Sequence, residues 1–147
     1  MKLSRYTDYA LRVLMYLGVR DDHRCSIREI SSAYRISENH LMKVVQDLAR
    51  LGYVQTIRGR GGGLHLALPA SQITIGEVVR HTETDMGLAD CGSCTLAGVC
   101  PLTAALAEAV RALLQVLDKV TLADAIGSKA ALLRRLGLPD SPPTANA

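Results

Sequence analysis

The stretch that decides the fold is ISENHLMKVVQDLARLGYVQTIRGRGGG, residues 36–63. Apolar residues recur in its first half with the spacing of one helix face; they are Leu41, Val44, Val45 and Leu48. Ser37 stands at the N-cap position and Gly52 where a helix C′ glycine belongs, so we expect a helix over about residues 38–51. The second half predicts a strand over 53–57 followed by a hairpin tip at 58–63, because glycine permits the positive φ of tight turns.

The residues before this stretch predict two more helices. An amphipathic pattern covers residues 4–19, with Ser4 or Thr7 as the cap. A short helix follows Ser26, which forms a capping box with Glu29.

After the hairpin tip, alternation predicts a second strand over residues 64–68, and Thr74 with Glu77 predicts a capping box for a helix through about residue 81. Three helices followed by a two-stranded hairpin is the order of a winged helix-turn-helix. We therefore expect a mainly α protein with a small β-hairpin, in which residues 1–81 form the DNA-binding domain.

Charge is distributed unevenly along the chain. The net charge of +3 divides into +5 over residues 1–80 and −2 over residues 81–147. Ten of the twelve basic residues in the first part are Arg, which makes forked contacts to phosphate and guanine. The first part is thus the better candidate for nucleic acid, although a solvated basic surface gives the same charge pattern.

A recognition helix of this type presents its N-terminal residues to base edges in the major groove. The residues at that end, with side chains suited to base pairs and phosphates, are Ser37, Glu38, Asn39, His40 and Lys43. On the hairpin tip, Arg58 and Arg60 suit a minor groove, and Gly61 beside them lets the backbone approach phosphates. A winged helix used only for protein contacts is the alternative.

Three of the four cysteines, Cys91, Cys94 and Cys100, are spaced C-x2-C-x5-C within a predicted loop over residues 82–101. Thiolates favour zinc, copper(I) or iron–sulfur clusters. Because a second C-x2-C pair is missing nearby, the spacing favours a cluster, with a zinc site and a thiol switch left open. Cys25 lies apart and is interpreted as a packed core residue.

The C-terminal part predicts a long helix from Pro101 to about Val120. Its apolar residues recur with the 3.5-residue period of paired helices; they are Leu102, Leu106, Ala109, Leu113, Val116 and Val120. We interpret residues 102–126 as a dimerisation helix and a short packing helix, although a core-facing helix shows the same pattern. Residues 127–147 are expected to be a partly disordered tail.

Taken together, these motifs resemble the family of dimeric bacterial winged-helix iron–sulfur transcriptional regulators that includes IscR, RirA and NsrR. The resemblance covers about residues 1–125. It rests on MKLSRYTDYALR at the start of the chain, ISENHLMKVV from residue 36, LGYV from residue 51, RGRGGG from residue 58, and the three cysteines. The chain is most similar to the NsrR type, repressors that sense nitric oxide.

This resemblance implies that Cys91, Cys94 and Cys100 hold an iron–sulfur cluster, with [4Fe-4S] favoured over [2Fe-2S]. No histidine follows Cys100 at the position where IscR-like members have a ligand, since the next residues are Pro-Leu-Thr. The resemblance instead implies that Asp8 of the partner subunit is the fourth ligand, with Arg12 coupling it to the helix. It also implies a homodimer on a palindromic operator in double-stranded DNA, with nitric oxide as the signal.

Two other functions remain open from the sequence: a family member that responds to iron or cluster supply, and a cluster-bearing redox protein without a DNA role. An enzyme is not expected, since neither a nucleophile–base motif nor a cofactor-binding glycine pattern is found. No apolar run is long enough for a membrane span, and the start of the chain does not read as a signal peptide. We therefore expect a cytoplasmic protein.

Overall fold

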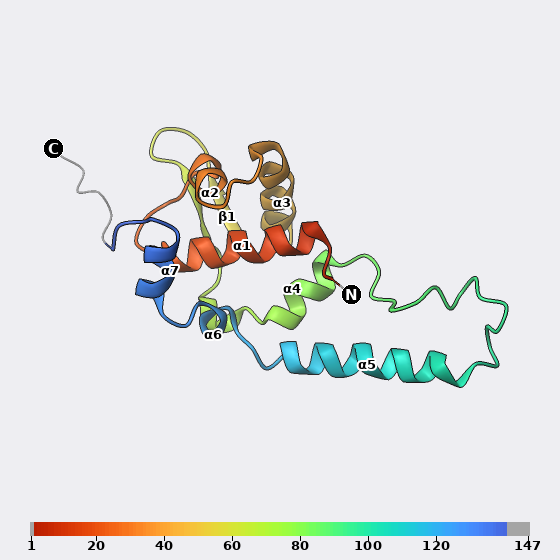
Figure 1. The fold of residues 1–147 in the computed structure, drawn as a ribbon. Helices are drawn as coiled ribbons and strands as arrows, with labels where there is room; N and C mark the ends of the chain where they lie inside the picture. The colour runs from red at the N-terminus through yellow and green to blue at the C-terminus, as the bar shows by residue number, and fades with distance from the viewer. Residues whose placement is uncertain (1, 141–147) are drawn as a thin grey trace.

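The computed structural model describes residues 2–140 as a helical head with a two-stranded hairpin and one long outlying helix (Figure 1). In chain order the elements are α1 (Arg5–Val19), α2 (Ile27–Tyr34), α3 (Glu38–Arg50), β1 (Val54–Ile57), β2 (Gly63–Leu66), a 3₁₀ turn (Ala70–Gln72), α4 (Ile75–Thr82), α5 (Pro101–Leu117), α6 (Leu122–Ile126) and α7 (Lys129–Arg135). This order confirms the expected mainly α winged helix-turn-helix. Within the described part, none of the helices has the length and apolar character needed to cross a membrane.

Local chemistry sets the helix ends largely as predicted. The Ser4 hydroxyl accepts a hydrogen bond from the Thr7 amide at 3.1 Å, which identifies Ser4 as the cap of α1. The capping box of Ser26 and Glu29 is present at the start of α2. Ser37 occupies the N-cap position of α3, but its side chain makes no capping hydrogen bond. Gly52 ends α3 with a φ of +84°, the left-handed conformation expected of a C′ glycine.

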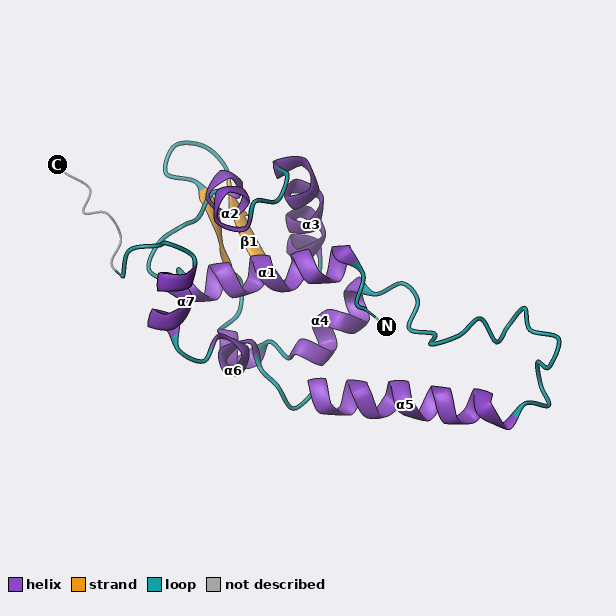
Figure 2. Cartoon of the chain, in the orientation of Figure 1, coloured by secondary structure: helices purple, strands orange, loops and turns teal. Residues whose placement is uncertain are grey.

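The hairpin is antiparallel, with Val54 opposite Leu66 and Ile57 opposite Gly63 (Figure 2). It is also tied to the segment before α2, because Cys25 and Leu64 exchange backbone hydrogen bonds of 2.9 and 2.7 Å. Cys25 is 1% exposed, which agrees with its interpretation as a packed residue.

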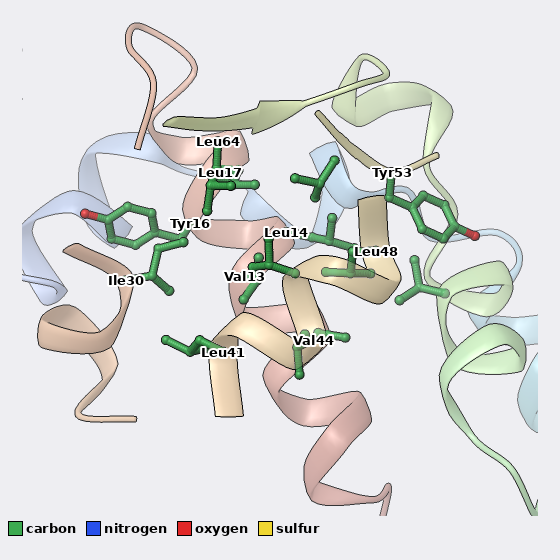
Figure 3. Packing of buried hydrophobic residues seen from close by; sticks show 14 of the residues in the cluster. Val13, Leu14, Tyr16, Leu17, Ile30, Leu41, Val44, Leu48, Tyr53 and Leu64 are labelled. Carbon is green, nitrogen blue, oxygen red and sulfur yellow. The ribbon is translucent and has the colours of Figure 1, made fainter. Parts of the chain in front are cut away.

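A single hydrophobic core joins α1, α2, α3, the hairpin, α4 and α6, and it is mainly aliphatic, with Tyr16 and Tyr53 also buried in it (Figure 3). Its largest fully buried side chains include Leu14, Leu17, Ile30, Leu41 and Leu48. The apolar stripes predicted for the first and third helices supply a large share of it, so burial of these stripes helps to explain why the sequence folds this way.

Helix α5 ends at Leu117, earlier than the predicted Val120. The chain turns there because Val120 is used elsewhere: its carbonyl accepts a 2.9 Å hydrogen bond from the Ile75 amide. Thr121 next to it begins α6 with a complete capping box to Asp124. The predicted box at α4 is only half formed, since the Thr74 hydroxyl accepts from the Glu77 amide without the reciprocal bond.

Helix α7 was not predicted, because residues 127–147 were assigned to a tail. It forms because Leu133, 2% exposed, is buried in tertiary packing, and because the segment after it returns to α1, where Arg20 Nη1 donates to the Pro139 carbonyl at 2.9 Å. The disorder expected for the end of the chain concerns residues 141–147, which lie outside the described residues.

Helices α4 and α5 are joined by a close contact at one point. The Arg80 guanidinium makes two hydrogen bonds to the Asp118 carboxylate, the longer at 2.7 Å, and these hydrogen bonds lower the pKa of Asp118. Gly76 allows this approach, because a Cβ atom there would stand 2.0 Å from Asp118 Oδ1 and 2.9 Å from its backbone nitrogen.

Replacing Gly76 by alanine should therefore destabilise the fold by about 1–3 kcal/mol, the usual cost of overpacking. The measurement is urea unfolding followed by circular dichroism. Gly92→Ala is the matched control, since its added Cβ would meet only one atom, at 3.9 Å. Equal stability of the two variants would contradict the contact.

Candidate DNA interface and cysteine loop

The start of α3 presents a polar, solvent-exposed surface. The residues predicted to read DNA there are all exposed; they are Ser37, Glu38, Asn39, His40 and Lys43. Because the Ser37 hydroxyl is not used as a helix cap, it is available to an outside partner. In Figure 1, α3 and the hairpin loop lie on the same side of the molecule, opposite α5.

The hairpin tip places Arg58, Arg60 and Gly61 in solvent. Its shape depends on glycine, since a Cβ at Gly62 would stand 2.2 Å from the Ile57 carbonyl oxygen. Arg24, which the sequence analysis did not single out, supports the tip: its Nη1 donates to the Gly61 carbonyl at 2.8 Å. The two residues are 37 positions apart, so no periodic pattern in the sequence indicates this contact.

Helix α1 contacts α3 through two tyrosines. The Tyr6 hydroxyl donates to the Asp47 carboxylate, and the Tyr9 ring lies 6.2 Å from the His40 ring. Burial, together with the bond to Asp47, raises the pKa of Tyr6 to about 12. The same bond lowers the pKa of Asp47. Tyr6 and Asp47 were not predicted from the sequence, because the two residues are 41 positions apart.

Asp8 and Arg12 lie four residues apart on α1 and form an ion pair. Arg12 Nε donates to Asp8 Oδ1 at 3.0 Å, and both side chains are nearly half exposed. The Arg12 guanidinium also lies 5.7 Å from the centre of the Tyr34 ring, within range of a cation–π contact. Asp8 is thus accessible from outside the protomer, while the Arg12 side chain that pairs with it is held against Tyr34 of α2.

The cysteines lie in the long segment between α4 and α5, which extends away from the head (Figure 1). The turn between Cys91 and Cys94 is shaped by Asp90, whose carboxylate accepts from the Ser93 hydroxyl at 2.6 Å and from its amide at 3.3 Å. Cys94 Sγ accepts from the Leu96 amide at 3.5 Å. Cys100 stands at the N-cap position of α5.

The donor set fits a soft metal centre, although the thiols do not converge within the chain. All three cysteines are free, and each has exposed surface. Among residues 2–140, no three histidine, cysteine or acidic side chains come close enough to hold a metal ion. Asp8 therefore does not join the cysteines of its own protomer, and the loop must close further to use its three thiols on one centre.

Two other candidate ligands are occupied elsewhere. His81, the histidine nearest the loop in sequence, makes a 2.7 Å hydrogen bond through Nδ1 to the Tyr53 hydroxyl. Burial raises the pKa of the Cys25 thiol to about 12, so this cysteine remains a protonated core residue. The cysteines available as metal ligands are therefore the three in the loop.

Helix α5 is almost without partners in the protomer. None of its residues is buried, and Leu102 and Val116 of its predicted seam are 60% and 61% exposed. An apolar helix of this length left uncovered indicates a surface for association.

Comparison with known proteins identifies the family. The Rrf2 family, described as iron-dependent transcriptional regulators, matches residues 3–128. The chain belongs to the Rrf2 family. It is 48% identical to the HTH-type transcriptional regulator NsrR of Geobacillus kaustophilus, over 90% of this chain and 94% of that protein. It is 47% identical to NsrR of Bacillus subtilis, over 92% and 97% of the two chains.

Solved structures agree with this assignment. The global cysteine regulator CymR of B. subtilis superposes with a TM-score of 0.72 at 27% identity, over 86% of this chain and 96% of its own. IscR of T. potens gives a TM-score of 0.69 at 25% identity, over 86% of each chain. This Rrf2 protein is therefore a winged-helix transcriptional regulator, which confirms the expectation of a regulator rather than an enzyme.

Replacing Arg60 by alanine should weaken DNA binding about tenfold at low salt and reduce the slope of log affinity against log salt by about one, as for loss of one phosphate contact. The measurement is fluorescence anisotropy with operator DNA over a salt series. The control is Arg134→Ala, which removes an exposed arginine from α7. The hairpin assignment is wrong if both variants bind as the wild type does.

Proposed function

We propose that this Rrf2 protein is an iron–sulfur-cluster-dependent transcriptional repressor that responds to nitric oxide. The observation that carries the proposal is the three-thiol loop, set apart from a complete winged helix. The chain as a whole is 48% identical to an NsrR regulator over 90% of its length. Two further features support it: a polar α3 start next to an arginine–glycine hairpin, and an accessible Asp8.

The DNA-reading role divides between α3 and the hairpin. Asn39 and Lys43 have the donors that suit adenine and guanine edges in the major groove, and Glu38 can accept from cytosine. Ser37 and His40 complete the surface that approaches the bases. Arg58 and Arg60 enter the adjacent minor groove, with Gly61 leaving room for the sugar–phosphate backbone. The expected partner is double-stranded DNA with a palindromic operator.

Cys91, Cys94 and Cys100 would hold a [4Fe-4S] cluster through three of its irons. When bound, the cluster supplies an iron site that a small diatomic ligand can reach. The amide of Leu96, which donates to Cys94 Sγ, is suited to stabilise a thiolate. The Asp90–Ser93 hydrogen bonds shape the turn between the first two thiols.

Asp8 would provide the fourth ligand to the cluster of the partner subunit. Its carboxylate is a hard ligand that is poorly matched to iron in a thiolate-rich site, so it is readily displaced. Arg12 holds the orientation of the carboxylate through the 3.0 Å pair. Since Asp8 lies in the first turn of α1, its attachment constrains the helix that contacts α3.

A homodimer through α5 completes the proposal. Cross-subunit ligation requires two copies, and the uncovered apolar face of α5 is the surface with which they can pair. The two reading heads would then lie on a two-fold axis, which matches a palindromic DNA site.

A second candidate is a regulator of the same fold that responds to iron or cluster supply. The description of the family as iron-dependent favours it. Chelation of iron would then change operator affinity, whereas nitric oxide would have little effect. A redox protein without a DNA role has no support among the matched regulators.

Protein kept without oxygen should show visible absorption from iron and sulfide, and Cys94→Ser should lose it. Operator affinity should fall about tenfold or more in that variant, a typical coupling between two sites. Treatment of the wild-type protein with nitric oxide should lower its operator affinity to the level of this variant. Anisotropy with operator DNA and iron and sulfide assays measure both effects.

The matched control is Cys25→Ala, which removes the thiol outside the loop and should keep both the absorption and the affinity. Absorption that disappears with nitric oxide while operator affinity stays unchanged would refute the sensing role.

A further inference from the structure

We propose that Tyr6 is a positioning residue that sets the orientation of the recognition helix α3 through its hydrogen bond to Asp47. The inference rests on the proposed function, in which α3 reads DNA and Asp8 fixes α1 to the partner subunit. It adds a residue pair, outside the ligands and the DNA-contacting residues, that carries the state of α1 to α3.

The pair joins the first turn of α1 to the last turn of α3. The Tyr6 hydroxyl donates to Asp47 Oδ2, and Tyr6 is partly buried between the two helices. A hydrogen bond from a hydroxyl to an ionised carboxylate is about twice as strong as a hydrogen bond between neutral groups. Because the tyrosine ring has only two side-chain torsions, the bond fixes α3 relative to α1 more firmly than a long flexible side chain would.

Asp47 connects this bond to the DNA-facing side of α3. Its second oxygen, Oδ1, accepts from Arg50 Nη2 at 3.1 Å, and the Arg50 side chain is 76% exposed. Lys43 stands one helical turn before Asp47, on the same face. Asp47 is thus bonded to one exposed cation of α3 and lies one turn from a second.

A second contact lies at the other end of α3, where the Tyr9 ring approaches the His40 ring at 6.2 Å. Tyr6 and Tyr9 are three residues apart and so share one face of α1, while Asp8 pairs with Arg12 on another face. Two contacts along α3 define its rotation as well as its distance. α1 thus presents the proposed cluster ligand Asp8 on one face and contacts the recognition helix α3 with another.

The test uses the full chain in cluster-loaded and cluster-free forms, with operator DNA and unrelated DNA as probes. Tyr6→Phe keeps the ring and removes the bond. It should lower the operator affinity of the loaded form about tenfold, the size expected for one bond to a charged group. The cluster-free form should change by less than about twofold, because α1 is not anchored there and has less constraint to transmit.

Asp47→Ala removes this bond and the pair with Arg50. The double variant should lose little more affinity than Asp47→Ala alone, because the bond to Tyr6 is already absent in that variant. Thermal unfolding of the cluster-free variants reports any general loss of stability. Tyr16→Phe is the matched control on α1: its hydroxyl has no hydrogen bond within residues 2–140, and the ratio of loaded to cluster-free affinity should stay that of the wild type.

The proposal is overturned if Tyr6→Phe loses operator affinity equally in both forms, if it retains the wild-type ratio, or if the two substitutions are additive. Failure of the proposed function has a different signature, namely a wild-type protein whose operator affinity is the same with and without its cluster.

Discussion

Burial of the apolar face of α1 is the constraint on which the rest of the structure depends. Val13, Leu14 and Leu17 are fully enclosed. Around them α1 contacts α2, α3, α4, α6, α7 and the second hairpin strand. No other helix of the described chain touches as many elements, so the positions of the recognition helix and the hairpin are both set by how α1 lies.

The same helix is also tied to the start of the cysteine loop. The Ser4 amide donates to Glu83 Oε1 at 2.6 Å, directly after α4 ends. The loop returns to the head through α5, whose last turn is held at the Arg80–Asp118 contact. A long extended segment is thereby attached to the head at two defined points, while the stretch between them keeps the freedom to rearrange around a ligand.

The sequence predicted the winged helix-turn-helix well because its signals are local. Apolar periodicity in α1 and α3, the Ser26–Glu29 box and Gly52 all act within a few residues of where they appear. Contacts between distant residues were not predictable in this way. Tyr6 with Asp47 and Arg24 with Gly61 arise only when the core brings their elements together, and α7 forms on a surface that α1 provides. Of the candidate site, residue types and exposure followed from the sequence, whereas the incomplete convergence of the three thiols did not.

Burial of Cys25 separates its thiol from the reactive thiols of the loop. Since its thiol is enclosed and stays protonated, electrophiles and oxidants that reach the loop thiols do not reach the core. An alkylating reagent applied to the native chain would accordingly label the loop and spare the interior.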